Sequence, residues 1–482
     1  MSEIPGTDPA TVGITPPPRS ILGWAAGFVR STLMNSRHGV RDTLVSMAPQ
    51  AVAVVTGVGS TVLIARGLGA EGVGLLAIIQ SLSGLAMALT DLGIGSTAVR
   101  YAARAAASGD RKAEFGVLRW AFRLRMGVTF LVTAVFCLVG PLALRLIWNT
   151  QGVGWLLFVA LLGGIFMALS HVPTIYFQAR HKFGTTAVIG VLQNLILFGG
   201  ICYVAVSRAW TVGAVLWATT IAAAMSALLF IIVVPKKALW QSGAATSRRL
   251  RNFLLCPWEP GAEGEESVHS FAWYYFLSAL AVMITTRLDV WLLGALQPKA
   301  ALGVYSVATR FTLPLAMLLG AMNTALWPRA SVQKDRTAVV ALLKRTFKVS
   351  CLAAGGALVY SIAAPLVAPL LFGTQYEHAT ILGQLLCIRY CIAICTCPIG
   401  IVGYSFGLVK SYWWINVVQL AAGVALDIAL IPQIGGAGAA ITLVLTDLLG
   451  FVLSGRILWR RVKSAAVPSA SSLGPRFSAE QP

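Results

Sequence analysis

Charged residues are scarce in this sequence. Lys, Arg, Asp and Glu make up 11% of the 482 residues, whereas hydrophobic residues make up 57%. A soluble domain carries about 25% charged residues, so this chain lacks the charge needed to cover a water-exposed surface. The composition therefore argues against a large soluble enzyme. Apolar stretches of about 20 residues recur along the chain, and each is long enough to cross a bilayer.

Acidic residues are the scarcest charged type. The 17 Asp and Glu residues face 37 Lys and Arg residues, which gives a formal net charge of +20. In a soluble protein this excess would indicate nucleic-acid binding. Here the basic residues lie between apolar stretches, so we interpret them as a topology signal and expect no nucleic-acid partner.

The sequence also lacks a disulfide or metal-binding pattern. Most of the 8 cysteines lie inside apolar stretches. Cys387, Cys391 and Cys395 share one helical face, but no His or carboxylate accompanies them. We interpret them as packing residues and expect no metal site.

Hydrophobicity predicts an all-α integral membrane protein with twelve transmembrane helices. The expected spans are about 43–65, 72–95, 126–147, 152–173, 186–206, 211–234, 269–293, 302–327, 349–372, 378–404, 413–432 and 436–459. The expected domains are a tail at 1–42 with an interfacial helix, a six-helix bundle at 43–234, a polar linker at 235–268, a second bundle at 269–460 and a tail at 461–482.

The basic residues predict the orientation of these spans. Of the 37 Lys and Arg residues, 30 fall in the tails and loops of one side, 4 fall on the other side, and 3 fall inside spans. Because basic loops stay in the cytoplasm, we expect both termini to be cytoplasmic. The alternation from loop to loop also supports the number of spans.

Two segments indicate an internal repeat. Ala65–Ile78 (ARGLGAEGVGLLAI) is similar to Gly294–Val307 (GALQPKAALGVYSV), and we match Gly72 with Gly303, at an offset of 231. Lys182 and Lys410 give an offset of 228, and each precedes an apolar span that contains Asn and Gln. Six spans per half make the two bundles parallel repeats, an arrangement typical of alternating-access transporters. A chance similarity of glycine-rich turns is the alternative.

Three arginines lie inside expected spans, at Arg287, Arg310 and Arg389. A charged residue at the centre of a membrane helix costs about 2.5–3.5 kcal/mol on insertion scales, so each is a candidate functional residue. Arg287 and Asp289 are two positions apart and therefore point to nearly opposite sides of a helix. Pairing with an acid on another helix, such as Asp427, is the structural alternative for Arg287.

Four aspartates are candidates for coupling or gating. They are Asp289, Asp427, Asp447 and Asp91. Asp427 and Asp447 lie on small, polar helix faces, which serve either close helix packing or coupling to Na⁺ or H⁺. Asp91 ends the second span near the cytoplasm, where it either caps a helix or forms an inner gate with a basic residue of 100–125.

Several stretches together resemble the bacterial polysaccharide (oligosaccharide, O-antigen) flippases. They are LGAEGVGLLAIIQSLSGLAMALTDLGIGSTAVR, FQARHKFGTTAVIGVLQNLI, LGVYSVATRFTLPL, PLLFGTQYEHATILGQLL and ALIPQIGGAGAAITLVLTD. That family shares a superfamily with multidrug and toxin extruders and lipid II flippases. The resemblance implies a V-shaped, MATE-like pair of bundles in the bacterial plasma (inner) membrane. It also implies transport of a polyprenyl-diphosphate-linked oligosaccharide for lipopolysaccharide or another surface polysaccharide, alongside other assembly proteins.

Such a substrate needs a cationic, water-filled cavity for its anionic head. Arginine binds phosphate oxygens in pairs and stays charged, so we expect Arg287, Arg310 and Arg389 to hold the diphosphate, with Arg66 joining them. We expect a transporter without a resident cofactor, surrounded by membrane lipids. A multidrug or small-cation antiporter is the first alternative, but it needs a neutral or acidic cavity. A membrane-embedded glycosyltransferase needs a large outward loop, and a scaffold would not explain the buried charges.

Overall fold

The computed structural model describes residues 37–464, with gaps at 92–93, 96–97, 100–101, 103–105, 107–108, 181, 235–267, 333–335, 374–375 and 406–407. The described residues form helices and contain no strand, which confirms the predicted all-α class. The expected N-terminal tail with its interfacial helix, most of the linker and most of the C-terminal tail lie outside the described residues. The domain limits therefore stay a prediction.

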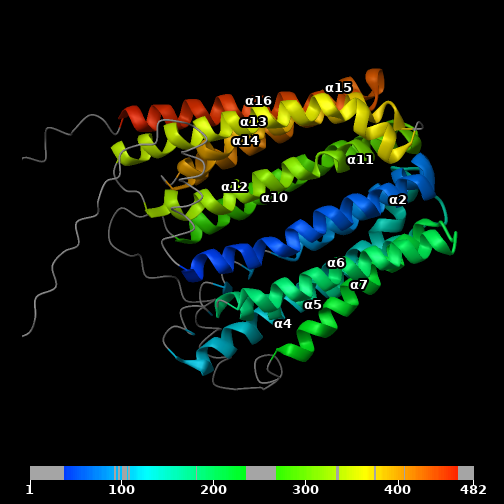
Figure 1. Ribbon diagram of the computed structural model, residues 1–482, viewed down its shortest axis with the longest axis horizontal. Coiled ribbons are helices and arrows are strands. Elements are labelled where there is room, and N and C mark those ends of the chain that lie inside the picture. The colour runs from blue at the N-terminus through cyan, green and yellow to red at the C-terminus, as the bar shows by residue number, and fades with distance from the viewer. Residues whose placement is uncertain are drawn as a thin grey trace, which may run out of the picture.

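Twelve helices make up the described chain (Figure 1). In chain order they are α2 (Arg37–Leu89), α4 (Arg111–Leu146), α5 (Gly154–Ala179), α6 (Phe183–Val206), α7 (Val212–Val233), α10 (Val268–Leu296), α11 (Lys299–Phe311), α12 (Leu313–Val332), α13 (Arg336–Phe372), α14 (Ala379–Ser405), α15 (Val409–Ile434) and α16 (Gly436–Ser464). Among these residues nine helices are long and apolar enough to cross a membrane, and a bent pair adds a tenth. The protein is therefore a multi-pass membrane protein.

Two irregular points reconcile these helices with the predicted spans. α2 combines the first and second spans, because Gly69 has φ 68° and ψ 176° and the chain reverses there. Conversely, α11 and α12 divide the eighth span, with a bend of 47° between them. Pro314 has no N–H to donate to the preceding turn, so the helix breaks next to it. The hydroxyl of Tyr360 donates to the freed carbonyl of Phe311 at 2.9 Å.

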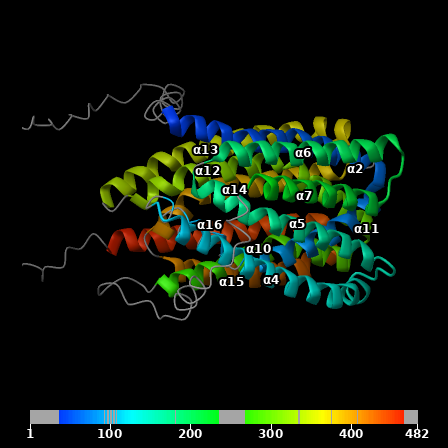
Figure 2. The same ribbon diagram turned by 90° about the horizontal axis from the view of Figure 1, so that it is seen from below.

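The helices form two groups that lie side by side in Figure 1, and in Figure 2 the helices of both groups run in roughly the same direction. The N-terminal half contains α2 and α4–α7, and the C-terminal half contains α10–α16. We call the end that holds the start of α2 and the end of α16 the basic end, because Lys182 and Lys410 also lie there. The opposite end, where α2 reverses at Gly69, is the distal end. It lies on the right of Figure 1.

The buried apolar core joins the halves only toward the distal end. One cluster there combines Ile78 of the N-terminal half with Leu293 and Leu302 of the C-terminal half. Toward the basic end, the N-terminal half has its own cluster around Val172 and the C-terminal half has another around Leu458. In the described part of the chain, the halves are thus packed together distally and have separate cores at the basic end.

Reciprocal glycine contacts relate the two halves. A Cβ added to Gly74 would meet the carbonyl oxygen of Lys299, and a Cβ added to Gly303 would meet the carbonyl oxygen of Ala70. Both equivalent pairs, Ala70 with Lys299 and Gly74 with Gly303, differ by 229 positions. The structure therefore corrects the repeat register, because Gly74, and not Gly72, is the counterpart of Gly303.

Candidate functional site

Arg287 on α10 and Arg310 on α11 form the candidate site, and we call them the arginine pair. Both side chains are exposed, although each lies inside an expected span. Arg310 lies eleven residues after the first residue of α11, which is about 16 Å at 1.5 Å per residue. That depth is close to the middle of a hydrocarbon core about 30 Å thick.

Arg310 faces the junction of the two halves. Its Nη2 donates to Oε1 of Gln80 on α2 at 3.1 Å, so the bond runs from the C-terminal to the N-terminal half. The positive charge of Arg287 is close enough to repel that of Arg310. Within the described residues neither arginine forms an ion pair with a carboxylate. Arg310 therefore places a positive charge at the junction of the halves, with the positive charge of Arg287 nearby.

Asp289 is buried whereas Arg287 is exposed, which agrees with the opposite helix sides that the sequence spacing predicts for two residues two positions apart. Its side chain is only 4% exposed. It accepts a hydrogen bond from the hydroxyl of Tyr305 and another from the main-chain N–H of Val290 at 2.8 Å. On α10, the side chain of Arg287 is therefore exposed and that of Asp289 is buried.

Asp427 on α15 lies in the same interior as Asp289. It is 2% exposed, and its Oδ1 has no hydrogen-bond partner among the described residues. The negative charges of Asp427 and Asp289 are close enough to repel, and Thr442 lies beside Asp427. Two carboxylates therefore share a buried region of the C-terminal half. The described residues contain no group of three or more His, Cys, Asp or Glu that could hold a metal ion.

Arg389 lies inside the C-terminal half, close enough to Asp289 and Tyr305 for their charges to interact. Its Nε donates to Oδ2 of Asp447 at 3.0 Å, and both side chains are largely buried. The guanidinium also lies over the ring of Tyr390, 5.4 Å from the centroid. An internal carboxylate thus neutralises Arg389, whereas the arginine pair has none.

Arg66 is placed near the distal end, away from the arginine pair. It lies three residues before the reversal at Gly69, and its Nη2 donates to the carbonyl oxygen of Leu370 on α13 at 2.8 Å. This bond also joins the N-terminal half to the C-terminal half. Arg66 therefore contributes to the closed distal end in this conformation.

Asp91 is placed at the basic end of the N-terminal half. Its carboxylate forms an ion pair with Arg125 of α4, and Nε2 of His171 on α5 lies 3.7 Å away. The partner is a basic residue of 100–125, as one of the sequence interpretations predicts. A second ion pair, Glu114 with Arg180, holds the same end together through two bonds of 2.6 and 2.7 Å. This hydrogen bonding to Glu114 raises the pKa of Arg180 above its usual value.

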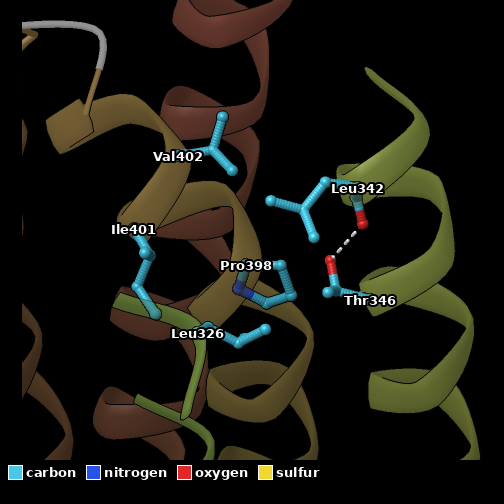
Figure 3. Close-up of a pocket in the computed structure, with 6 residues that line it drawn as sticks. All are labelled: Leu326, Leu342, Thr346, Pro398, Ile401 and Val402. Atoms are coloured by element: carbon cyan, nitrogen blue, oxygen red, sulfur yellow. Dashed lines mark hydrogen bonds between the residues drawn. The ribbon is translucent and has the colours of Figure 1, made fainter. Parts of the chain in front are cut away.

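A small pocket in the C-terminal half is too small for a lipid-linked substrate. Figure 3 shows it between α12, α13 and α14, where Pro398, Leu326 and Leu342 point toward one another. Its volume is about 10 Å³, and its lining is almost wholly apolar. A cavity of this size holds about one water molecule.

Residues 40–332, which are more than half of the chain, match the family described as "Polysaccharide biosynthesis protein". The chain belongs to this family. This membership confirms the family suggested by the resemblance of the sequence segments. A curated relative from Haloferax volcanii, "Probable flippase AglR", is 26% identical over 217 residues. That match covers 44% of this polysaccharide biosynthesis protein and 45% of the relative, so it spans less than half the relative's length.

Solved structures show the fold of this polysaccharide biosynthesis protein. An inward-facing multidrug resistance MATE transporter of the MOP superfamily matches with a TM-score of 0.65 at 13% identity, over 88% of this chain and 100% of that one. The lipid II flippase MurJ in an inward closed conformation matches with a TM-score of 0.67 at 13% identity, over 87% of each chain. The MATE-like fold predicted from the sequence is thus confirmed.

Sequence reasoning missed some polar residues of this polysaccharide biosynthesis protein. Gln80 was not singled out, although an amide in the apolar segment LLAIIQSLSG is a detectable signal. Tyr305 was missed because a tyrosine in an apolar helix is ordinarily packing. Trp148 and Tyr376 were missed because their partners are main-chain carbonyls, which carry no sequence signal.

Proposed function

We propose that this protein is a flippase that moves a polyprenyl-diphosphate-linked oligosaccharide from the inner to the outer leaflet for surface polysaccharide biosynthesis. The observation that carries the proposal is the arginine pair, two exposed positive charges at mid-membrane depth between the halves. A diphosphate head needs such charges, since guanidinium groups bind phosphate oxygens with short, charge-assisted hydrogen bonds. Membership of the polysaccharide biosynthesis protein family supports the same substrate class.

In this proposal Arg287 and Arg310 contact the diphosphate directly. Two opposite unit charges 4 Å apart attract by about 4 kcal/mol at an effective dielectric constant of 20. Bound phosphate would therefore offset both the burial cost of the arginines and their mutual repulsion. In this proposal the oligosaccharide approaches from the basic end, where the two halves have separate apolar cores. Arg66 would meet the head later, when the distal end opens.

The orientation follows from the charge distribution. We assign the basic end to the cytoplasm, because cytoplasmic loops carry an excess of Lys and Arg. Both termini would then be cytoplasmic and the membrane would be the plasma membrane. We propose that Asp91, which forms an ion pair with Arg125 at this end, acts in an inner gate. Other polysaccharide-assembly proteins would supply the lipid-linked sugar on the cytoplasmic side and use it on the outer side.

We further propose that Asp289 and Asp427 couple transport to Na⁺ or H⁺. Two repelling carboxylates in a buried region have a strong tendency to bind a cation or a proton. Arg389 and Asp447 differ from them, because each already neutralises the other. We therefore propose that Arg389 orients the residues of this interior and that Asp447 is its counter-ion. In this proposal the diphosphate binds to the arginine pair.

A multidrug or small-cation antiporter is the second candidate. The likeness to a MATE transporter fold and the buried Asp289 and Asp427 fit that function. However, the charged groups that solvent reaches in the opening are arginines, which repel a cationic substrate. The flippase is favoured because the accessible charge at the junction matches an anionic head.

Export of lipid-linked oligosaccharide by cells that depend on this protein tests the proposal. We expect Arg287→Ala and Arg310→Ala each to reduce surface polysaccharide strongly at equal protein level. Arg145→Ala is the matched control, because Arg145 is an exposed arginine in the last turn of α4, away from the opening. Undiminished export in both test variants would rule out the arginine pair as the head-group site. Drug resistance without an export defect would favour the antiporter.

A further inference from the structure

Two aromatic side chains close the distal end in a reciprocal way. Nε1 of Trp148, just after α4, donates to the carbonyl oxygen of Trp291 on α10 at 3.0 Å. The hydroxyl of Tyr376, just after α13, donates to the carbonyl oxygen of Ala65 on α2 at 3.0 Å. Each bond therefore runs from one half of the molecule to the other.

The two bonds occupy equivalent places in the repeat. The donors Trp148 and Tyr376 are 228 positions apart, and the acceptors Ala65 and Trp291 are 226 positions apart. Both offsets are close to the 229 that relates Gly74 to Gly303. In each half the donor follows the third span and the acceptor belongs to the first span of the other half. Such agreement arises when one two-fold rotation relates the halves.

We propose that the hydrogen bonds of Trp148 and Tyr376 form together when the distal end is closed and break together when it opens. We call these two residues the latches of one distal gate. Both donors are buried, with Trp148 6% and Tyr376 0% exposed. Both bonds cross the surface along which the halves would separate. Since the acceptors are main-chain atoms, replacing Ala65 or Trp291 would not remove either bond. Each bond can be removed by substitution only at its donor residue.

The latches are not the only contacts that hold the distal end closed in the described part of the chain. Nε1 of Trp291 donates to Oγ of Ser81 at 3.0 Å, which adds a deeper bond between the halves. The apolar cluster of Ile78, Leu293 and Leu302 also joins the halves. A variant that lacks one latch therefore keeps most of the closed interface. It should fold and populate the open state more often.

The inference deepens the proposed function, because a gate serves only a transporter, but its test needs no substrate. Hydrogen–deuterium exchange would be measured on the full chain in lipid nanodiscs for Trp148→Phe, Tyr376→Phe and the double variant. Loss of one hydrogen bond worth about 1 kcal/mol shifts the closed-to-open equilibrium about fivefold. Two latches that break together shift it by about 25-fold, because their free energies add.

We expect faster exchange at the distal end, in residues 64–74 and 290–303. A gate that opens one end while the other closes must also slow exchange toward the basic end, in residues 283–288 and 315–323. Tyr360→Phe is the matched control, because Tyr360 donates to the carbonyl of Phe311 within one half. That variant should show neither change.

Faster distal exchange without protection toward the basic end would overturn the proposal, since the two bonds would then stabilise only their immediate surroundings. Unchanged exchange in both single variants, or the same pattern in Tyr360→Phe, would also overturn it. If Trp148→Phe reduces the yield of folded protein, Tyr376→Phe carries the test alone, because it removes a single hydroxyl. These outcomes do not depend on the identity of the transported lipid.

Discussion

Arg310 and Gln80 join the two halves through a hydrogen bond of 3.1 Å between a guanidinium and a neutral amide. An amide orients the arginine without neutralising it. The arginine therefore keeps its full charge at the mid-membrane junction, beside the like charge of Arg287. An anion that enters the opening would gain attraction from both residues. This choice of a neutral partner distinguishes Arg310 from Arg389, whose partner is the carboxylate of Asp447.

The first prediction concerns the charge of the residue at position 80. Gln80→Glu gives Arg310 an anionic neighbour, so we expect polyprenyl diphosphate to bind at least about tenfold more weakly, a loss of about 1.4 kcal/mol. Gln80→Met is the control, because it removes the hydrogen bond and adds no charge. Titration of polyprenyl diphosphate into the protein in nanodiscs measures both. Equal affinities for the two variants would show that the charge of Arg310 does not bind the head.

The second prediction concerns the close crossing of α2 and α11. Gly74→Ala places a methyl group against the main chain at Lys299, and Gly303→Ala does the same at Ala70. Over-packing of this kind costs about 1–3 kcal/mol, so both variants should unfold at a lower temperature. Gly84→Ala is the control, since nothing lies within 4 Å of an added Cβ there and alanine favours helix. If Gly74→Ala is as stable as Gly84→Ala, the reciprocal crossing does not hold the halves together.

The third prediction concerns the ion pair of Arg389 and Asp447. Removing one partner leaves a buried unpaired charge, which typically costs about 3–5 kcal/mol. Arg389→Met and Asp447→Leu should therefore each destabilise the protein strongly, while the double variant should recover most of the loss. Thermal unfolding of all four proteins completes the cycle. The double variant should also keep measurable flipping, whereas a diphosphate-binding Arg389 would leave it inactive although folded.

The fourth prediction concerns coupling at Asp427. Asp427→Asn keeps the shape of the side chain but removes the charge, so transport should lose its dependence on a Na⁺ or H⁺ gradient. Proteoliposomes with either gradient imposed separately measure the effect and identify the ion. Glu377→Gln is the control, because Glu377 is exposed near the distal end. Retained gradient dependence in Asp427→Asn would remove Asp427 from the coupling site.

The sequence predicts much of this fold because membrane insertion requires long apolar stretches that can be recognised directly. Apolar length predicts the spans, and Pro314 signals the break between α11 and α12. The spacing of Arg287 and Asp289 predicts that they lie on nearly opposite sides of a helix, and Arg287 is indeed exposed whereas Asp289 is buried. The repeat register was two residues off because Gly72 was matched with Gly303, whereas both the two segments aligned end to end and the contact across the crossing pair Gly74 with Gly303.

The partners of the buried charges could not be predicted in the same way. Arg389 and Asp447 are 58 positions apart on different helices, so their pairing depends on helix packing. The free-energy cost of inserting a charged residue into the membrane applies equally to Arg287, Arg310 and Arg389, so the sequence does not distinguish their roles. Only their surroundings separate them, because solvent reaches the first two and a carboxylate neutralises the third.

Flipping of a polyprenyl-diphosphate-linked oligosaccharide in proteoliposomes tests the central claim most directly. Purified protein would be reconstituted with the lipid in the vesicle membrane, and arrival of the sugar in the opposite leaflet would be followed with an impermeant sugar-modifying enzyme. We predict flipping by the unaltered protein and by Arg145→Ala, and none above protein-free vesicles by the folded Arg287→Ala/Arg310→Ala variant. Flipping by that double variant at the rate of the unaltered protein would contradict the claim that the arginine pair carries the diphosphate.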